Sequence, residues 1–199
     1  MLGSARKSEP AWANDTSFMA TFGKTLHREV GASLLRPAVG ENVNLGKRRG
    51  YSQFGEDVMA FERYFWELVN GTFLEMGALD GLLVTNTYQY ERRLGWKGVL
   101  IEASKANFDQ IQVNRPEALD LNVAVCGEPQ MVHVAEADGL GGIYEFMSDG
   151  FRQRWKAVHE KGGDPMKLPA VPCLPLMVML EAYGIKHINF YSLDVEGAE

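Results

Sequence analysis

The distribution of apolar residues divides the chain near residue 50. Before that point, only the stretch 18–35 has the spacing of a short helix, and Gly, Pro, Ser and Asn are frequent. After it, apolar runs recur at lengths suited to regular elements. We therefore predict a flexible N-terminal tail at 1–50 and a folded domain at 51–199.

An amphipathic helix is predicted at the start of this domain. Ser52 is a suitable N-cap, and acidic residues follow in the expected first turn. Apolar side chains then share one helical face; they are Phe54, Val58, Phe61, Phe65 and Leu68. Gln53 and Asp57 lie four residues apart and would share another face, which could cover a cofactor or simply meet solvent.

Strands and helices are then expected to alternate. Apolar runs predict strands at 72–76, 99–101, 121–125 and 187–193, and helical spacing predicts helices ending near 93, at 105–114 and at 174–183. This order indicates an α/β fold with a mostly parallel sheet.

Residues 127–173 fit the alternation less well. A strand at 131–135 and a helix at 151–159 are expected there, separated by Gly-rich loops. An insertion of this kind in an open α/β sheet is a usual place for substrate contacts.

The charge of the chain argues against a nucleic-acid partner. Residues 50–199 contain twelve Lys and Arg against twenty-two Asp and Glu, and the basic run 47–49 is interpreted as a solvated linker. No apolar run has the length of a membrane span, and the N-terminus lacks the apolar core of a secretory signal. We expect a soluble protein, with a cytoplasmic location favoured and no signal for an oligomeric state.

Cysteine and histidine carry little signal. Cys126 and Cys173 lack the spacing of a zinc site or a redox dithiol and are expected to be buried free thiols. The four histidines share no catalytic spacing, although His133 and His159, in the insertion, stay candidate bases.

Acidic residues near the ends of the first two strands carry the chemistry. Glu75 precedes a turn with Gly77 and Gly81, whose spacing differs from the G-x-G-x-x-G of dinucleotide binding. A carboxylate there would repel a diphosphate and attract the ammonium and sulfonium charges of S-adenosylmethionine (SAM). Glu102 ends the next strand 21 residues after Gly81, where it could accept hydrogen bonds from both ribose hydroxyls.

Six segments occur in an order and spacing that together carry a family resemblance. They are YSQFGED (51–57), LEMGALDG (74–81), NT (86–87), LGWKGVLIE (94–102), NRP (114–116) and SLDVEGAE (192–199). The chain resembles the FkbM family of SAM-dependent methyltransferases. The sequence departs from the family pattern at two places: Glu75, where Asp is also common, and Val84-Thr85, where Ser would be usual before Asn86.

The resemblance implies a class I Rossmann-like fold and O-methylation of a hydroxyl on a sugar, glycan or natural-product-like small molecule. It implies cofactor contacts by the first segment and by the strand-end acids. The candidate cofactor-binding residues are Gln53, Glu75, Gly77, Ala78, Asp80, Gly81, Asn86, Glu102, Ala103 and Asp194.

Asp194 and Glu196 are the catalytic candidates. They lie on alternate sides of an extended strand end, and either could accept the hydroxyl proton if burial raises its pKa. The pair is too thin a ligand set for a divalent ion, so no metal is expected.

The fold class is thus α/β, class I Rossmann-like, with a mostly parallel sheet. Because the chain stops just after the fourth predicted strand, we expect a domain truncated at that point. Two other functions stay open: a catalytically inactive cofactor-binding or scaffold fragment, and an NAD-dependent oxidoreductase, which the glycine spacing disfavours.

Overall fold

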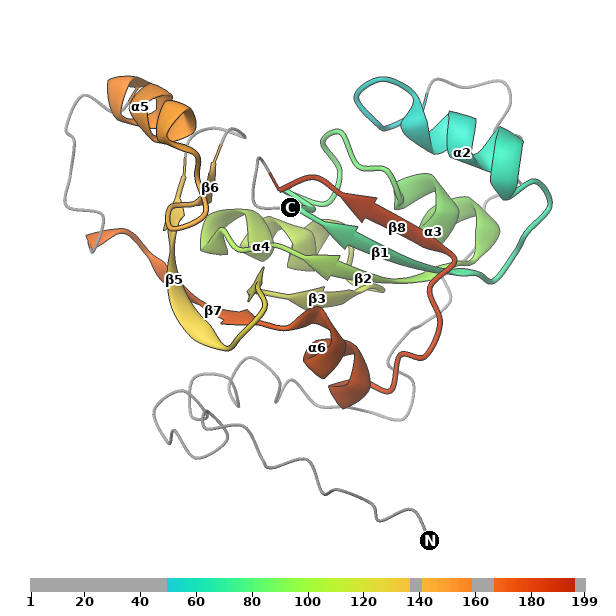
Figure 1. The fold of residues 1–199 in the computed structure, drawn as a ribbon. Helices are drawn as coiled ribbons and strands as arrows, with labels where there is room; N and C mark the ends of the chain where they lie inside the picture. The colour runs from blue at the N-terminus through green and yellow to red at the C-terminus, as the bar shows by residue number, and fades with distance from the viewer. Residues whose placement is uncertain (1–49, 137–140, 159–166, 196–199) are drawn as a thin grey trace, which may run out of the picture.

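The computed structural model describes residues 50–136, 141–158 and 167–195 (Figure 1). The helices are α2 (Glu56–Tyr64), α3 (Tyr88–Leu94), α4 (Lys105–Asn114), α5 (Asp149–Val158) and α6 (Leu176–Ala182). The strands are β1 (Thr72–Met76), β2 (Lys97–Ile101), β3 (Leu119–Leu121), β4 (Ala124–Val125), β5 (Gln130–Ala135), β6 (Gly142–Ile143), β7 (Ala170–Leu174) and β8 (Phe190–Leu193). The predicted helix at 18–35 and the basic run at 47–49 lie outside the described residues.

The first sheet has four strands in the order β3-β2-β1-β8, and all of its pairs are parallel. Helix α6 covers one face, and α2, α3 and α4 lie on the other (Figure 1). Side chains of β1 alternate between these layers: Leu74 and Met76 join the core on the α6 side, whereas Phe73 packs with α3 and α4. The predicted α/β fold with a parallel sheet is confirmed.

The strand register brings three chain segments level at one edge of this sheet. Met76, the last residue of β1, pairs with Ile101 of β2 on one side and with Leu193 of β8 on the other. The residues that follow are Gly77, Glu102 and Asp194. Because the three strands are parallel, these residues leave the sheet side by side at its carboxyl edge.

The second sheet was not expected. Its order is β4-β7-β5-β6, with β4 parallel to β7 and with β5 antiparallel to both β7 and β6. The predicted strand at 121–125 is wrong as a single element, because it divides at Asn122 into β3 and β4, which belong to different sheets. The side-chain amide of Asn122 donates to the carbonyls of Glu102 and Ala103, which holds this bend.

Strand β7 accounts for a second error of the prediction. The segment around Leu174 was expected to begin a helix, but Leu174 ends β7 and α6 begins at Leu176, after the N-cap Pro175. The expected strand at 131–135 is confirmed by β5, and α5 confirms a helix near 151–159, within its described residues.

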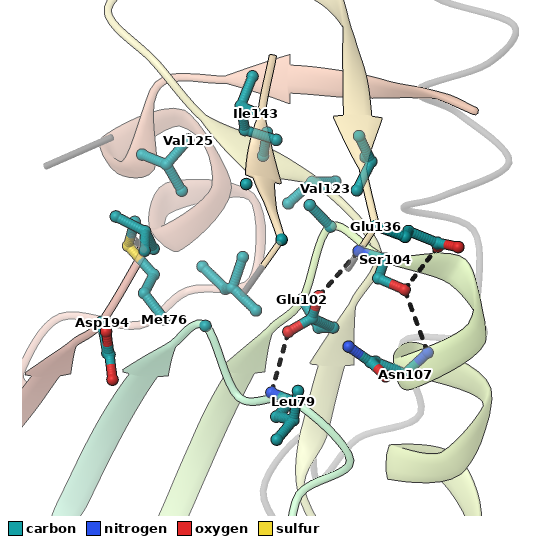
Figure 2. Close-up of a pocket in the computed structure, with 18 of the residues that line it drawn as sticks. Met76, Leu79, Glu102, Ser104, Asn107, Val123, Val125, Glu136, Ile143 and Asp194 are labelled. Carbon is teal, nitrogen blue, oxygen red and sulfur yellow. Dashed lines mark hydrogen bonds between the residues drawn. The ribbon is translucent and has the colours of Figure 1, made fainter. Parts of the chain in front are cut away.

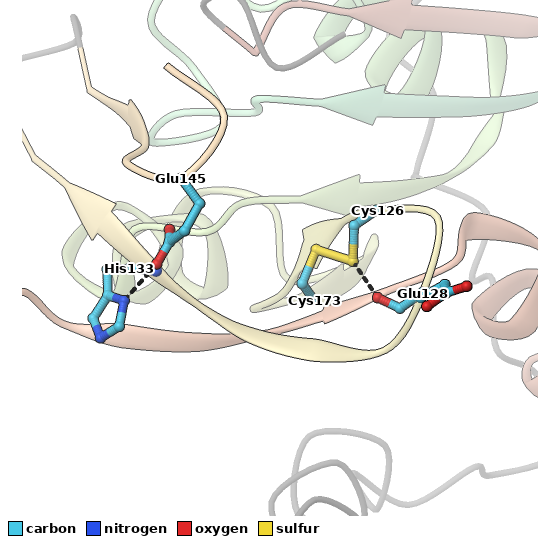
Figure 3. Close-up of a disulfide and its surroundings, with 5 residues drawn as sticks. All are labelled: Cys126, Glu128, His133, Glu145 and Cys173. Carbon is cyan, nitrogen blue, oxygen red and sulfur yellow. Dashed lines mark hydrogen bonds and ion pairs between the residues drawn. A yellow bond between two sulfur atoms is a disulfide. The ribbon is translucent and has the colours of Figure 1, made fainter. Parts of the chain in front are cut away.

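Cys126 and Cys173 form a disulfide, so the expectation of free thiols is wrong. The bond joins the end of β4 to β7 across a separation of 47 residues, with Cα atoms 5.7 Å apart (Figure 3). The parallel pairing of Ala124 with Cys173 brings the two segments together. Because strand β7 was not predicted, its pairing with β4, which brings the two cysteines together, could not be predicted either.

The N-terminal helix is shorter than expected. Helix α2 begins at Glu56 after Gly55, whose φ of 89° ends the preceding turn, so Ser52 is not its N-cap. Gln53 lies before the helix and is exposed, and Asp57 is fully buried, so their predicted common face is wrong. The reason is the Asp57 carboxylate, which accepts hydrogen bonds from the Ser52 hydroxyl and the Tyr51 amide and bends this segment back.

Candidate active site

A cavity of about 310 Å³ lies at the carboxyl edge of the parallel sheet (Figure 2). One side consists of the residues that follow the level strands, and the facing side comes from the second sheet, including Val134 and Ile143. Polar groups lie at two ends: Glu102 at one and Asp194 at the other (Figure 2). A largely apolar hollow with a few placed polar groups is typical of small-molecule sites.

Gly77 permits the backbone of β1 to turn at this cavity. Its φ is 75°, and an added Cβ would lie 1.7 Å from the Asp194 carbonyl oxygen. The position therefore requires glycine for two reasons, conformation and space. Its amide donates to the Ile101 carbonyl at 3.0 Å, which continues the pairing of the strands into the turn.

Glu102 is the buried acid of the cavity, with 9% of its surface exposed. One carboxylate oxygen accepts from the Leu79 amide at 2.9 Å and the other from the Ser104 amide at 2.8 Å. Burial raises the pKa of Glu102 to about 7; the two backbone hydrogen bonds oppose this rise, and nearby Glu136 adds to it. The Asn107 side chain also hydrogen-bonds this carboxylate, whose four lone pairs leave some acceptor capacity for a ligand.

Ser104 links Glu102 to the opposite wall. Its hydroxyl donates to Glu136 at 2.7 Å and accepts from the Asn107 amide as the N-cap of α4 (Figure 2). These three lining residues were not predicted from the sequence. Ser104 was detectable as a helix N-cap, whereas Glu136 reaches the cavity only through the unpredicted second sheet.

Glu75 lies beneath the loop that follows β1 and is not among the lining residues. It is 3% exposed and accepts hydrogen bonds from the Thr85 and Thr87 hydroxyls and from the Asn86 amide. Its carboxylate therefore organises the segment 85–87. The predicted direct contact of Glu75 with a cofactor has no support from this position.

Arg115 fills the space under the same loop. It is 1% exposed and lies between the rings of Phe73 and Tyr88, at 5.5 Å and 5.4 Å from their centres. Its guanidinium forms an ion pair with Glu91 at 2.6 Å and donates to the Gly81 carbonyl at 3.0 Å. A buried ion pair thus holds the loop from below.

The structure brings four of the predicted site residues to the cavity lining: Gly77, Glu102, Ala103 and Asp194. Others lie in or under the adjoining loop and are absent from the lining: Glu75, Ala78, Asp80, Gly81 and Asn86. Gln53 lies in the exposed turn before α2, and Glu196 lies outside the described residues.

His133 points away from the cavity. It alternates along β5 with Val134, which lines the cavity, so the two side chains lie on opposite faces of the strand. Its Nδ1 lies 2.6 Å from a carboxylate oxygen of Glu145 (Figure 3). The other candidate base, His159, is outside the described residues.

Within 50–136, 141–158 and 167–195, no three His, Cys, Asp or Glu residues are grouped so that they could hold a metal ion. In the same ranges, no helix combines the length and apolarity needed to cross a membrane.

The fold is that of an α/β protein with a cavity at the carboxyl ends of parallel strands, where open α/β sheets usually bind their ligands. Residues 75–199 match the family model of the methyltransferase FkbM domain. Because this match covers more than half of the chain, the chain belongs to the FkbM methyltransferase family. No curated protein and no solved structure matches it.

Proposed function

We propose that this chain is a SAM-dependent methyltransferase that methylates a hydroxyl oxygen, built on a class I Rossmann-like domain. The observation that carries the proposal is the level register of three parallel strands, which places Gly77, Glu102 and Asp194 around one cavity. Membership of the FkbM family supports methyl transfer as the reaction. The acidic residues of the cavity support SAM as the methyl donor, because SAM carries positive charge.

The end of the cavity near Glu102 suits an adenosine group. Glu102 offers two acceptor oxygens to the paired ribose hydroxyls, and hydrogen bonds to a charged acceptor contribute about 1.5–3 kcal/mol each. Ala103 and Val123 supply apolar surface beside it for a purine ring. An acidic acceptor beside an apolar surface fits a nucleoside that carries no diphosphate.

The opposite end suits the positively charged part of SAM. Gly77 lets the backbone approach a ligand closely, and the carboxylate of Asp194 attracts ammonium and sulfonium charge. We assign Glu75 a supporting role, in which it holds the loop over the cavity and does not touch the cofactor.

When bound, the cofactor supplies a methyl group activated by the sulfonium. The chain orients the acceptor hydroxyl in line with that methyl group, because alignment provides much of the rate gain in such displacements. We assign the role of general base to Asp194, which lines the cavity and is exposed; it would accept the proton of the acceptor hydroxyl as the oxygen is methylated. Glu196 stays the alternative base.

The test measures methyl transfer from isotope-labelled SAM to a panel of sugars and hydroxylated natural products, with product masses read by mass spectrometry. We expect a gain of one methyl group on oxygen, and a decrease of kcat by about 10²–10⁴ in Asp194→Asn. Asp109→Asn, which removes an exposed carboxylate on α4, is the control. A thermal shift with NAD but none with S-adenosylhomocysteine (SAH) would support the oxidoreductase instead.

A further inference from the structure

Two apolar side chains of the loop between β1 and α3 are held outward beside the cavity. Leu83 is 60% exposed and Val84 is 40% exposed, and Val84 also lines the cavity together with Gly77 and Asp194. An exposed apolar side chain gains little from folding. What distinguishes these two residues from other exposed apolar side chains is the adjoining cavity and the conformation of their loop.

The backbone of this loop is strained at Val84. Its φ is 50°, in the left-handed region that glycine and asparagine tolerate and that β-branched residues avoid. Leu79, earlier in the same loop, also has a φ of 50°. Strained conformations persist where surrounding contacts determine them, and they occur often at ligand-binding positions.

Polar contacts fix the loop on the side nearer β1. One carboxylate oxygen of Asp80 accepts from the amides of Leu82 and Leu83, at 2.8 Å and 2.7 Å. The Asn114 side chain donates to the Asp80 carbonyl at 2.8 Å, which ties this turn to α4.

Buried charges fix the loop on the side nearer α3. Thr85 donates to Glu75 at 2.8 Å, and Arg115 donates to the Thr87 hydroxyl at 3.2 Å. Both charged side chains are almost fully buried. Leu83 and Val84 are thus presented by a segment that is anchored on both sides, and the anchoring sustains the strain at Val84.

We propose that Leu83 and Val84 form an acceptor-binding lip, which contacts hydrocarbon surface adjoining the hydroxyl that is methylated. The lip selects acceptors with an alkyl or ring substituent over fully hydrophilic ones. This proposal rests on the proposed function, because Val84 lines the same cavity as Asp194, to which the methyl transfer is assigned. Continuity of Val84 with the cavity lining favours the acceptor over a second copy of the chain.

The test titrates the protein with methyl, butyl and hexyl β-D-glucopyranosides and follows binding by the methyl NMR signals of the protein, with and without saturating SAH. We expect affinity to rise about twofold for each added methylene, about half the free energy of complete burial. The shifts should be largest at Leu83 and Val84. The rise should disappear in a Leu83→Ser, Val84→Asn variant, in which asparagine suits the positive φ.

Val113→Asn is the matched control, because Val113 is an equally apolar side chain, 74% exposed on α4. It should keep the dependence on chain length. The proposed lip would be overturned if the protein bound all three glycosides with equal affinity, or if affinity rose with chain length equally in the Leu83→Ser, Val84→Asn variant. Dimerisation of the protein through Leu83 and Val84 would overturn it too. Failure of SAH to bind would instead count against the proposed function, and the titration without SAH tests the lip in either case.

Discussion

The two sheets supply different halves of the same cavity. The parallel sheet contributes Gly77, Glu102 and Asp194 from level strand ends, whereas the second sheet contributes mostly apolar side chains such as Val134 and Ile143. The parallel half therefore contributes two of the three acidic residues of the lining, Glu102 and Asp194, and the second half contributes Glu136 and much of the apolar wall. Enclosure has a chemical effect too, because burial is the main cause of the raised pKa of Glu102.

The two halves are also stabilised differently. A buried ion pair between Arg115 and Glu91 lies behind the loop of the parallel half. A disulfide between Cys126 and Cys173 joins β4 to β7 in the second half. Each half can therefore be weakened separately.

The largest effect is expected from Arg115→Met, which breaks the ion pair of the parallel half. The Glu91 carboxylate would be left buried without its cation, so the free energy of unfolding should fall by about 3–5 kcal/mol. Urea unfolding at pH 7 measures the change. Lys105→Met removes an exposed pair with Asp109 and should change stability by less than about 0.5 kcal/mol. An equal effect of both substitutions would contradict this account.

Opening the disulfide should destabilise the second half by about 2–4 kcal/mol. Unfolding is compared with and without dithiothreitol, and a Cys126→Ser, Cys173→Ser variant, which should not respond to the reductant, serves as the control. Amide exchange should accelerate in β5 and β7 and change less in β1 and β2. Faster exchange confined to β1 and β2 would contradict the division into two halves.

Glu102 should make stability depend on pH. Its pKa is about 7 in the folded chain against 4.5 as the ordinary value, so the folded state binds more protons and the free energy of unfolding falls as pH rises from 4.5 to 7. The loss should total about 3 kcal/mol and should be absent in Glu102→Gln. Urea unfolding from pH 4.5 to 8 measures it, with the exposed Glu62→Gln as control. The same loss in Glu102→Gln would assign it to other groups.

The smallest effect is expected from Glu136→Gln, which removes a negative charge contributed by the second half. The pKa of Glu102 should fall by less than about one unit, because burial, the main cause of its rise, is unchanged. The amide oxygen of Gln can still accept from Ser104. An NMR titration of the Glu102 carboxyl carbon measures the shift, and an increase in the pKa would be inconsistent with this electrostatic coupling.

The parallel half could be predicted from sequence and the second half largely could not. Strand β1, helix α4 and the strand-end position of Glu102 follow from local spacing, and parallel strands end at one edge. The pairing of β4 with β7 depends on residues far apart in the chain, which local spacing does not report. For the same reason, neither the Cys126–Cys173 disulfide nor the position of Glu136 in the cavity lining could be predicted.

Within the parallel half, the direction of side chains was the weak point. Glu75 and Glu102 were both expected to face a ligand, yet the Glu75 carboxylate binds Thr85, Asn86 and Thr87 under the loop. Spacing places a residue near a strand end, but contacts with neighbouring segments decide where its carboxylate points.

Calorimetric titration with SAH between pH 6 and pH 8 tests the central claim most directly. If Glu102 accepts hydrogen bonds from the ribose as a carboxylate, SAH should bind at one site, and its affinity should rise about tenfold over this range as the acid with a pKa of about 7 ionises. Glu102→Gln should bind more weakly and without this pH dependence. Absence of SAH binding, or the same tenfold rise in Glu102→Gln, would contradict the account.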